Sequence, residues 1–299
     1  MSLIEKAAKR LEELRRAGVL LQDANDGDVA IPDQRSNAAP SVVRQTKSAP
    51  LLPAQAHSRH VKIDLAALTA AGFVTSDNTR SRVADEFRVL KRPLIANASG
   101  KSAAPIKNGN LIMVTSALAG EGKSYCAVNL AISTAMELDR SVLLVDADVA
   151  RPSLPRLLGI TESKGLLDVL QDKTLDLSQV LLRTSIDKLS LLTSGTRHER
   201  ATELLASNAM GALLAELASR YQDRIIIFDS PPINITTEAR VLATHMGQIA
   251  FVVQAERTAQ REVALALAAI ESCPVKLLVL NQARTATQGA YGYGYGYAT

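Results

Sequence analysis

The sequence predicts an α/β fold in which helices cover both faces of a doubly wound, mostly parallel sheet. Short apolar runs recur along the second half of the chain, and each is nearly continuous rather than alternating. Such runs are typical of parallel strands that are buried on both faces. Helical patterns lie between them, as an alternating strand–helix fold requires. One run ends in a glycine-rich loop and two others end in aspartates, which points to a ligand site at the carboxyl edge of the sheet.

Composition narrows the class of protein. A chain of 299 residues with 47% hydrophobic residues is long enough for a full α/β core and additional segments. No apolar run approaches the ~20 residues of a membrane helix, and the charged start has no signal-peptide pattern, so the sequence predicts a cytoplasmic protein. Cys126 and Cys273 show no metal-ligand spacing. The net charge of +4 is spread along the chain, which does not indicate nucleic-acid binding.

Four segments are expected from the N-terminus onward. Residues 1–21 carry apolar residues at helical spacing among charged ones, which predicts an amphipathic helix that docks on a partner or on the main domain, with a lipid surface as the alternative. Residues 22–60 are polar and aperiodic, as in a flexible linker. The main domain is expected at 61–288, and a tail of alternating Gly and Tyr follows at 289–299.

The main domain begins with two predicted helices, a short one near 63–71 and a longer one near 80–97 that contains a proline. Within the longer helix, Asp85, Arg88 and Lys91 recur every three residues. This spacing places them along one side of the helix. The residues alone leave open whether they form a solvated face with local ion pairs or a contact with another subunit.

The next segment has the order of a phosphate-binding loop. Leu111 to Val114 form an apolar run, Ala117 to Gly122 form a small-residue loop, and a helical pattern starts at Lys123 and Ser124. In such a loop, backbone N–H groups surround phosphate oxygens, the lysine reaches the β- and γ-phosphates, and the serine hydroxyl faces Mg²⁺. Ala117 replaces the usual first glycine. A plain strand-to-helix turn is the alternative.

Five further strands are expected at Ser141–Asp146, Leu189–Thr193, Ile225–Asp229, Ile249–Gln254 and Val275–Asn281, all read as buried, with clear helices at Asn208–Tyr221 and Arg261–Ile270. Asp146 and Asp148 follow one strand end, and Asp229 ends another. We expect the three carboxylates to converge beside the phosphate loop and to hold Mg²⁺ or accept a proton. Each aspartate taken singly could instead cap a helix.

The motifs ALAGEGKS, LLVDADVARP and IIIFDSPP resemble the Walker A, Walker A′ and Walker B motifs of bacterial tyrosine kinases, P-loop ATPases with deviant Walker motifs. The resemblance runs from about Asp85 to Thr299. The helix DEFRVLKRP resembles the oligomerisation helix of this family, and the tyrosine-rich tail resembles its autophosphorylation cluster. The opening MSLIEKAAKRLEELRRAG and the phrase EFRVLKRPLIANA are similar to the stand-alone kinases of exosortase-type exopolysaccharide loci.

The resemblance implies roles for individual residues. Nucleotide binding falls to Ala119, Gly120, Glu121, Gly122, Lys123, Ser124, Tyr125, Arg151 and Asn281, with Asn281 at the adenine and Arg151 at a phosphate or a neighbouring subunit. Catalysis falls to Lys123 and to Asp146, Asp148 and Asp229, with Asp146 as the base, and the three aspartates and Ser124 also form the expected magnesium site. Subunit contacts fall to Asp85, Arg88 and Lys91, and phosphorylation to Tyr291, Tyr293, Tyr295 and Tyr297.

The function implied is an ATP- and Mg²⁺-dependent tyrosine autokinase that modifies its own tail in trans and controls exopolysaccharide synthesis or export. The implied partners are further copies of the chain, a membrane chain-length or co-polymerase protein that recruits it to the inner face of the membrane, and a tyrosine phosphatase. Two alternatives stay open: a partition- or division-type ATPase switch, and an export subunit with vestigial catalysis. Leu118 stands where partition-type relatives carry a lysine, which argues against the switch.

Overall fold

The computed structural model describes residues 59–101, 104–220 and 224–283, all within one of the two units into which the chain divides, residues 53–299. The helix expected at 1–21, nearly all of the linker and the tyrosine tail lie outside the described residues. Where the linker prediction meets the structure, its last residue, His60, already begins the strand β1 (His60–Val61). Among the described residues, no helix has the length and apolarity needed to cross a membrane.

The unit 53–299 is built on an eight-stranded sheet with the order β1-β4-β5-β3-β6-β2-β7-β8. All neighbouring strands are parallel except β4 and β5, which are antiparallel. After β1, the strands span Leu111–Ser116 (β2), Ser141–Asp146 (β3), Leu182–Thr184 (β4), Leu189–Leu192 (β5), Arg224–Asp229 (β6), Gln248–Gln254 (β7) and Val275–Asn281 (β8). The predicted mostly parallel, doubly wound sheet is confirmed.

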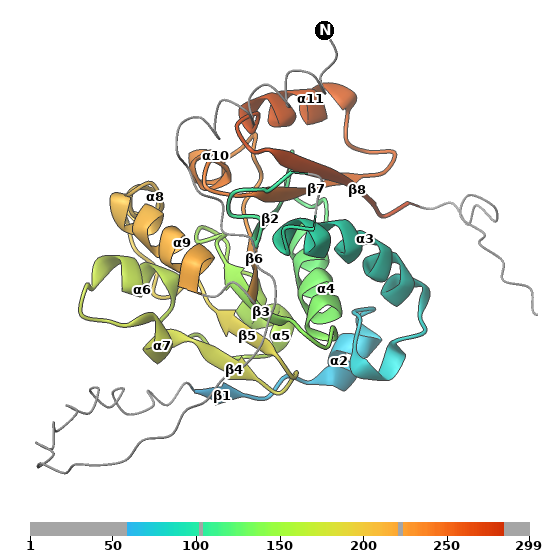
Figure 1. Cartoon of the computed structure of the whole chain (residues 1–299), viewed down its shortest axis with the longest axis horizontal. Helices are drawn as coiled ribbons and strands as arrows, with labels where there is room; N and C mark the ends of the chain where they lie inside the picture. The colour runs from blue at the N-terminus through green and yellow to red at the C-terminus, as the bar shows by residue number, and fades with distance from the viewer. Residues whose placement is uncertain (1–58, 102–103, 221–223, 284–299) are drawn as a thin grey trace, which may run out of the picture. The chain divides into compact units, whose positions relative to one another are not determined.

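Helices cover both faces of the sheet, as Figure 1 shows. One layer contains α2 (Leu65–Ala70), α3 (Arg82–Ala98), α4 (Lys123–Ala135) and α5 (Leu154–Leu158), with the short 3₁₀ turn η1 (Ser76–Asn78) between α2 and α3. The other layer contains α6 (Leu166–Gln171), α7 (Leu177–Val180), α8 (Ala201–Leu205), α9 (Asn208–Arg220), α10 (Thr237–Ala243) and α11 (Gln260–Ala269). Each layer encloses its own hydrophobic cluster against the sheet.

The helix predicted near 80–97 is α3, which packs on α4. Its first turn is capped by Ser81, whose hydroxyl accepts the Ala84 N–H at 3.2 Å, so one free backbone donor is satisfied. Phe87 and Leu94, seven residues apart, are both buried on the side that faces the sheet. Pro93 lies inside the helix without ending it. The apolar stripe in the sequence therefore identifies the packed face.

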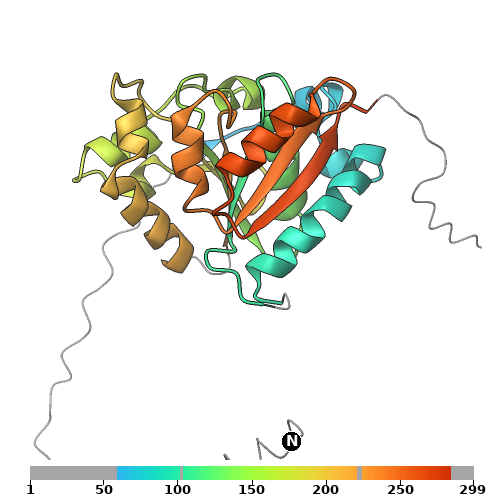
Figure 2. The ribbon, with the colours of Figure 1, turned by 90° about the horizontal axis from the view of Figure 1, so that it is seen from above.

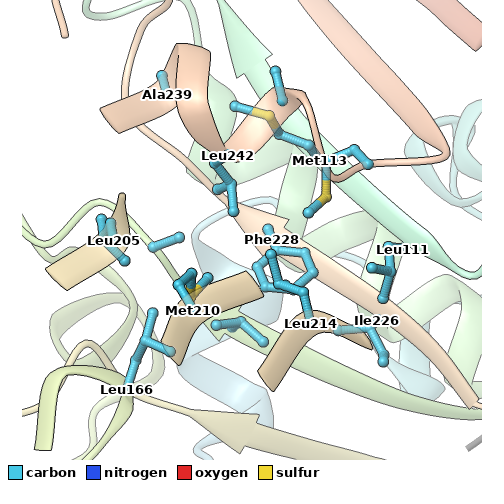
Figure 3. Packing of buried hydrophobic residues seen from close by; sticks show 14 of the residues in the cluster. Leu111, Met113, Leu166, Leu205, Met210, Leu214, Ile226, Phe228, Ala239 and Leu242 are labelled. Atoms are coloured by element: carbon cyan, nitrogen blue, oxygen red, sulfur yellow. The ribbon is translucent and has the colours of Figure 1, made fainter. Parts of the chain in front are cut away.

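The central strands are buried on both sides because alternate residues enter opposite clusters. Ile226 and Phe228 of β6 pack with α9 and α10, and Figure 3 shows the Phe228 ring among Met210, Leu214 and Leu242. Ile227, between them, points into the other cluster with α4. At ~25 cal/mol per Å² of buried apolar surface, this double burial stabilises the strands whose ends carry the site.

The structure differs from the prediction at the edges of the sheet. The short strands β1 and β4 were not predicted, since runs of two and three residues carry no periodicity. Strand β8 was expected to be buried, but it is the last strand in the order, and Leu278 and Leu280 are 61% and 67% exposed. Figure 2 shows α3 and α11 on opposite sides of β7 and β8. Helix α11 covers β7 and leaves that face of β8 open.

Candidate functional site

The predicted phosphate loop connects β2 to α4 at the carboxyl edge of the sheet. Gly120 and Gly122 have φ values of 84° and 94°, in the left-handed region that favours glycine. At Gly122 a Cβ would also overlap the amide nitrogen of Asn281. Lys123 opens α4 and is buried. The backbone of this loop therefore has the conformation and the close neighbours that only glycines permit, followed by the N-terminus of a helix.

The Glu121 side chain, within the predicted nucleotide-binding loop, is turned inward. Its buried carboxylate accepts the Leu118 N–H at 2.6 Å, the Gln254 N–H at 3.4 Å and the Thr258 hydroxyl. The carboxylate therefore braces the loop against β7 and the turn that follows β7. Only its backbone remains for phosphate. Ala119 lies exposed at the tip of the loop, where its backbone is accessible.

The Tyr125 side chain is likewise directed away from the predicted nucleotide site. Its hydroxyl donates to the Gly72 carbonyl at 2.8 Å. Its ring packs on Phe73 and Phe87, with centroids 4.9 and 6.3 Å away, and burial raises the pKa of its phenol. Tyr125 therefore ties α4 to the α2–α3 region, and its backbone N–H in the first turn of α4 is the part left for phosphate.

Asn281 lies at the end of β8, the last strand, as predicted, and the structure places it beside the phosphate loop. Its Nδ2 donates to the Glu121 carbonyl at 2.8 Å. The next residue, Gln282, donates from Nε2 to the Gly120 carbonyl at 3.4 Å and accepts from the Gln254 amide at 2.6 Å. Three amide side chains thus border the loop, and the sequence indicated only Asn281 among them.

Two of the three aspartates predicted to converge, Asp146 and Asp229, lie side by side. Strands β3 and β6 are neighbours, and the register places Asp146 opposite Asp229. Both side chains are fully buried. Asp146 Oδ2 accepts the backbone N–H groups of Ser153 and Leu154 at 3.2 and 3.1 Å, whereas the Oδ1 atoms of both aspartates are buried without a hydrogen-bond partner among the described residues.

Ser153 connects this pair to the phosphate loop, and the sequence analysis did not identify it. Its hydroxyl donates to Ser124 Oγ at 2.9 Å and lies 3.4 Å from Asp229 Oδ2. The only signal in the sequence was its position after Arg-Pro and before α5, which suggests a helix cap. In the structure it makes no side-chain cap. Its hydroxyl instead joins the Ser124 and Asp229 side chains.

The electrostatics of the pair follow from its burial. Burial, and then the charge of Asp229, raise the pKa of Asp146 to about 8. Burial raises the pKa of Asp229 to about 7, although a hydrogen bond from Ser124 and the Lys123 charge lower it. The pKa of Asp148 is raised overall, because burial outweighs the hydrogen bond that the Arg151 N–H donates to its Oδ1 at 3.1 Å. Without a cation, the pair holds protons near neutral pH.

The donor set fits a magnesium ion that binds together with phosphate. Mg²⁺ prefers oxygen ligands and is held by one or two carboxylates together with phosphates and waters. The unpaired Oδ1 atoms of Asp146 and Asp229 and the Ser124 hydroxyl are such oxygens. In the described part of the chain, no three His, Cys, Asp or Glu side chains form a metal cage by themselves. Phosphate oxygens and waters therefore have to complete the coordination.

The three residues predicted to join subunits do not share one surface. Asp85 and Arg88 are exposed and pair with each other, and Arg88 also donates to the Thr79 carbonyl at 2.9 Å. Lys91, in contrast, is 4% exposed, forms an ion pair with Glu137 at 2.7 Å and donates to the Ser133 carbonyl. A step of six residues rotates Lys91 toward α4. The expectation that it lies along the same side as the other two was wrong.

Arg151 is exposed on the loop after β3, where its side chain is open to a ligand or a neighbouring molecule. Tyr291, Tyr293, Tyr295 and Tyr297 lie outside the described residues. Of the predicted site residues, those that the structure brings to one place are the phosphate loop, Ser124, Asp146, Asp148, Asp229 and Asn281.

Comparison with known proteins adds a family context. The family model described as "ParA: NUBPL iron-transfer P-loop NTPase" matches residues 107–278. The tyrosine-protein kinase YwqD of Bacillus subtilis (strain 168) is 34% identical over 184 residues, which cover 61% of this chain and 76% of YwqD. The putative tyrosine-protein kinase CapB of Staphylococcus aureus is 27% identical over 75% of this chain and 95% of its own length. The solved kinase domain of the Escherichia coli tyrosine kinase ETK matches with a TM-score of 0.64 and 26% identity, covering 75% of this chain and 85% of that domain.

Proposed function

The chain belongs to the ParA-type P-loop NTPases and, within them, to the bacterial tyrosine-protein kinases, and we propose that it is an autokinase for its own C-terminal tyrosines. The γ-phosphate of ATP would be transferred to Tyr291, Tyr293, Tyr295 and Tyr297 of another copy of the chain. The observation that carries this proposal is the buried pair of Asp146 and Asp229 in register beside Ser124. Relatives named as tyrosine kinases and the tyrosine-rich tail support it.

Each residue has a task that follows from its position. The backbone of the loop, from Ala119 to Gly122, and the first turn of α4 surround the phosphates, and Lys123 neutralises their charge. Ser124, Asp146, Asp148 and Asp229 hold the magnesium and its waters, and the bound ion offsets charge on the phosphates during transfer. Asn281 hydrogen-bonds the adenine and Arg151 contacts a phosphate or the neighbouring copy.

Asp146 is the proposed base. A tyrosine hydroxyl has a pKa near ~10, so its proton must move to an acceptor as the new bond forms. Oδ2 of Asp146 is held by the N–H groups of Ser153 and Leu154, which leaves Oδ1 without a partner in the described residues. The fixed orientation leaves this oxygen to accept the proton once the side chain is ionised, with Asp146 then contacting the magnesium only through one of its waters.

Transfer in trans requires copies of the chain to meet. We propose that Asp85 and Arg88, which are exposed, contribute to this contact, and that Lys91 supports α3 from inside. The Gly-Tyr alternation of the tail lets each tyrosine enter a site without bulky neighbours. A membrane chain-length or co-polymerase protein would activate the kinase at the inner face of the membrane through residues 1–21, a tyrosine phosphatase would reset the tail, and the output would be exopolysaccharide synthesis or export.

A second candidate function is an ATPase switch of the partition or division type that binds a membrane partner without phosphorylating tyrosine. The match to the ParA model favours it. Leu118 counts against it, because this residue stands where partition-type relatives carry a lysine, and its side chain packs against the hydrophobic cluster beneath α10 and α11.

Intact mass after incubation with Mg²⁺ and ATP separates the two functions. For the wild-type chain we expect one to four added phosphates that map to the tail, and none for Lys123→Met. ATP turnover without phosphate on the tail would favour the switch. If neither occurs, the measurement is repeated with the cytoplasmic segment of a co-polymerase, and a negative result there would leave only the vestigial subunit.

A further inference from the structure

A groove of about 400 Å³ lies next to the carboxylate cluster, at the carboxyl edge of the sheet. One wall is the loop after β3, and the others are the segment before and within α8 and the start of α10. Its lining residues are Val149, Ala150, Arg197, His198, Glu199, Ala201, Thr202 and Glu238. The volume is at the lower end of the ~300–1,000 Å³ typical of small-ligand sites.

The groove is beside the reacting position and not at it. Lys123, Ser124 and Asp146 do not line it. However, Val149 and Ala150 directly follow Asp148 in the chain, and Glu238 lies in the first turn of α10, the helix that follows β6 and Asp229. A substrate whose hydroxyl lies at the carboxylate cluster therefore has its neighbouring residues over the groove.

The spacing of the tail matches this arrangement. In an extended segment, residues two apart point to the same side and are separated by about 6.8 Å. Asp148 and Ala150 are two residues apart, so their Cα atoms are at most about 7.6 Å apart. The four tail tyrosines also recur at every second position. When one tyrosine lies at the carboxylate cluster, the next one along is therefore close enough to reach the Val149–Ala150 wall.

We propose that this groove binds the tail tyrosine two residues from the reacting one, and that it accepts this neighbour only while it is unphosphorylated. The inference rests on the autokinase function proposed above and assigns it a second substrate subsite. The occupant is a tyrosine of another copy's tail. The apolar surface of the exposed Ala150 and the half-buried Ala201 receives the ring, and the polar rim receives the hydroxyl.

The charges of the groove explain the discrimination. Its lining contains one arginine, Arg197, and two carboxylates, Glu199 and Glu238. The Glu238 carboxylate is fixed by the Thr202 hydroxyl, which donates to it at 2.6 Å. A neutral phenol can donate to such a carboxylate, whereas a phosphotyrosine carries about −1.5 to −2 charge and is repelled by Glu199 and Glu238, which outnumber Arg197 in the lining. Each reacting tyrosine therefore needs an unmodified neighbour in the groove. Phosphorylation then proceeds along the tail in one direction, so that the next tyrosine to enter the groove is always unmodified.

The test separates donor from acceptor. The donor is the full chain with Tyr291, Tyr293, Tyr295 and Tyr297 changed to Phe, and it cannot be phosphorylated on its tail. The acceptor is the full chain with Lys123→Met, and it cannot transfer phosphate. All transfer therefore occurs in trans, and the intact mass of the acceptor measures it. Ala150→Trp in the donor fills the groove, and we expect the initial rate of transfer to fall about tenfold or more. The same change in the acceptor, and the exposed control Ala264→Trp in the donor, are expected to leave the rate unchanged.

Charge is tested with synthetic peptides of residues 286–299 that carry one reacting tyrosine and either tyrosine or phosphotyrosine two positions away. The donor with an unchanged groove is expected to bind the unphosphorylated peptide more tightly than the phosphotyrosine peptide, as measured by fluorescence anisotropy. It is also expected to phosphorylate the unphosphorylated peptide at least tenfold faster. Glu199→Lys should reduce that ratio several-fold. Because this readout is a ratio, it decides the question even if Ala150→Trp does not fold.

The outcomes are distinguishable. If the donor with an unchanged groove transfers phosphate and the Ala150→Trp and Glu199→Lys donors behave like it, the groove inference is wrong and the autokinase stands. If the wild-type donor transfers no phosphate to the acceptor tail, the proposed function itself fails, and the inference fails with it. Loss of transfer in the Ala264→Trp donor equal to that in the Ala150→Trp donor would also overturn the inference.

Discussion

Asp146→Asn is expected to stabilise the protein at alkaline pH in the absence of metal and nucleotide, although it removes the proposed base. The wild-type carboxyl is fully buried opposite Asp229. Burial and the Asp229 charge raise its pKa to about 8. Ionising this group inside the folded protein is therefore unfavourable, and an uncharged amide of nearly the same shape avoids the penalty.

The sign and the size follow from linkage. The pKa of an aspartate in the unfolded chain is about 3.9, and the folded-state value is raised, so the stabilising contribution of protonated Asp146 is complete below about pH 4 and is lost as the pH rises toward 8. About four pKa units at ~1.4 kcal/mol each set an upper limit of about 6 kcal/mol. The amide introduced by Asp146→Asn would place its NH₂ at the unpartnered Oδ1 position, which costs about 1–3 kcal/mol. The expected net gain at about pH 8.5 is at most about 3–5 kcal/mol.

Urea unfolding with EDTA, at about pH 5 and about pH 8.5, measures this gain. The advantage of the Asn variant should be present at the higher pH and absent at the lower one, and the exposed carboxylate variant Asp187→Asn should show no such difference. A wild-type free energy of unfolding that does not fall between the two pH values would refute the reasoning. So would an Asn variant that is less stable than wild type at both.

Three further changes test individual contacts. Lys91→Ala removes the buried partner of Glu137, which keeps a second ion pair with Arg92 at 3.3 Å, and should lower the free energy of unfolding by about 1–3 kcal/mol. Arg82→Ala on the exposed face should change it by less than about 1 kcal/mol, and equal effects would contradict the burial argument. Tyr125→Phe loses one hydrogen bond and about 1 kcal/mol but should keep its ATP affinity in calorimetry, so a large loss of affinity would restore the tyrosine hydroxyl to the nucleotide site. Gly122→Ala should abolish nucleotide binding while circular dichroism stays native, because the new Cβ would overlap Asn281; retained binding would show that the loop can adjust.

The sequence predicted the central strands well because each combines a continuous apolar run with a functional end. The expected strand Ser141–Asp146 and the structure agree at both ends. Strand β8 misled the prediction, since Leu278 and Leu280 look like buried residues in a run that lies at the sheet edge. Whether a face of an edge strand is covered depends on the strand order, which local periodicity does not contain.

The site was predictable to the extent that its residues belong to short motifs. The aspartates at strand ends converge because parallel strands share one edge, and Asn281 follows the same rule. Lys91 was placed on the wrong side of α3 and Ser153 was missed, because their roles depend on tertiary partners: Glu137 follows the end of α4, and Ser124 lies nearly thirty residues away from Ser153. Composition and spacing make Lys91 look like a surface residue, and only packing shows that it is buried.

The buried aspartate pair explains why the site combines rigidity with a loss of stability. Two carboxylates in register, both without solvent, destabilise the folded chain near neutral pH, yet the surrounding contacts keep them in place: the N–H groups of Ser153 and Leu154 hold one, and the Ser153 hydroxyl lies against the other. A cation that arrives with nucleotide removes the repulsion without reorganising these contacts. The unfavourable interaction in the free protein therefore becomes binding energy in the complex, and the strands that position the pair must be firmly packed on both faces. The burial of Ile226, Ile227 and Phe228 on both faces meets that requirement.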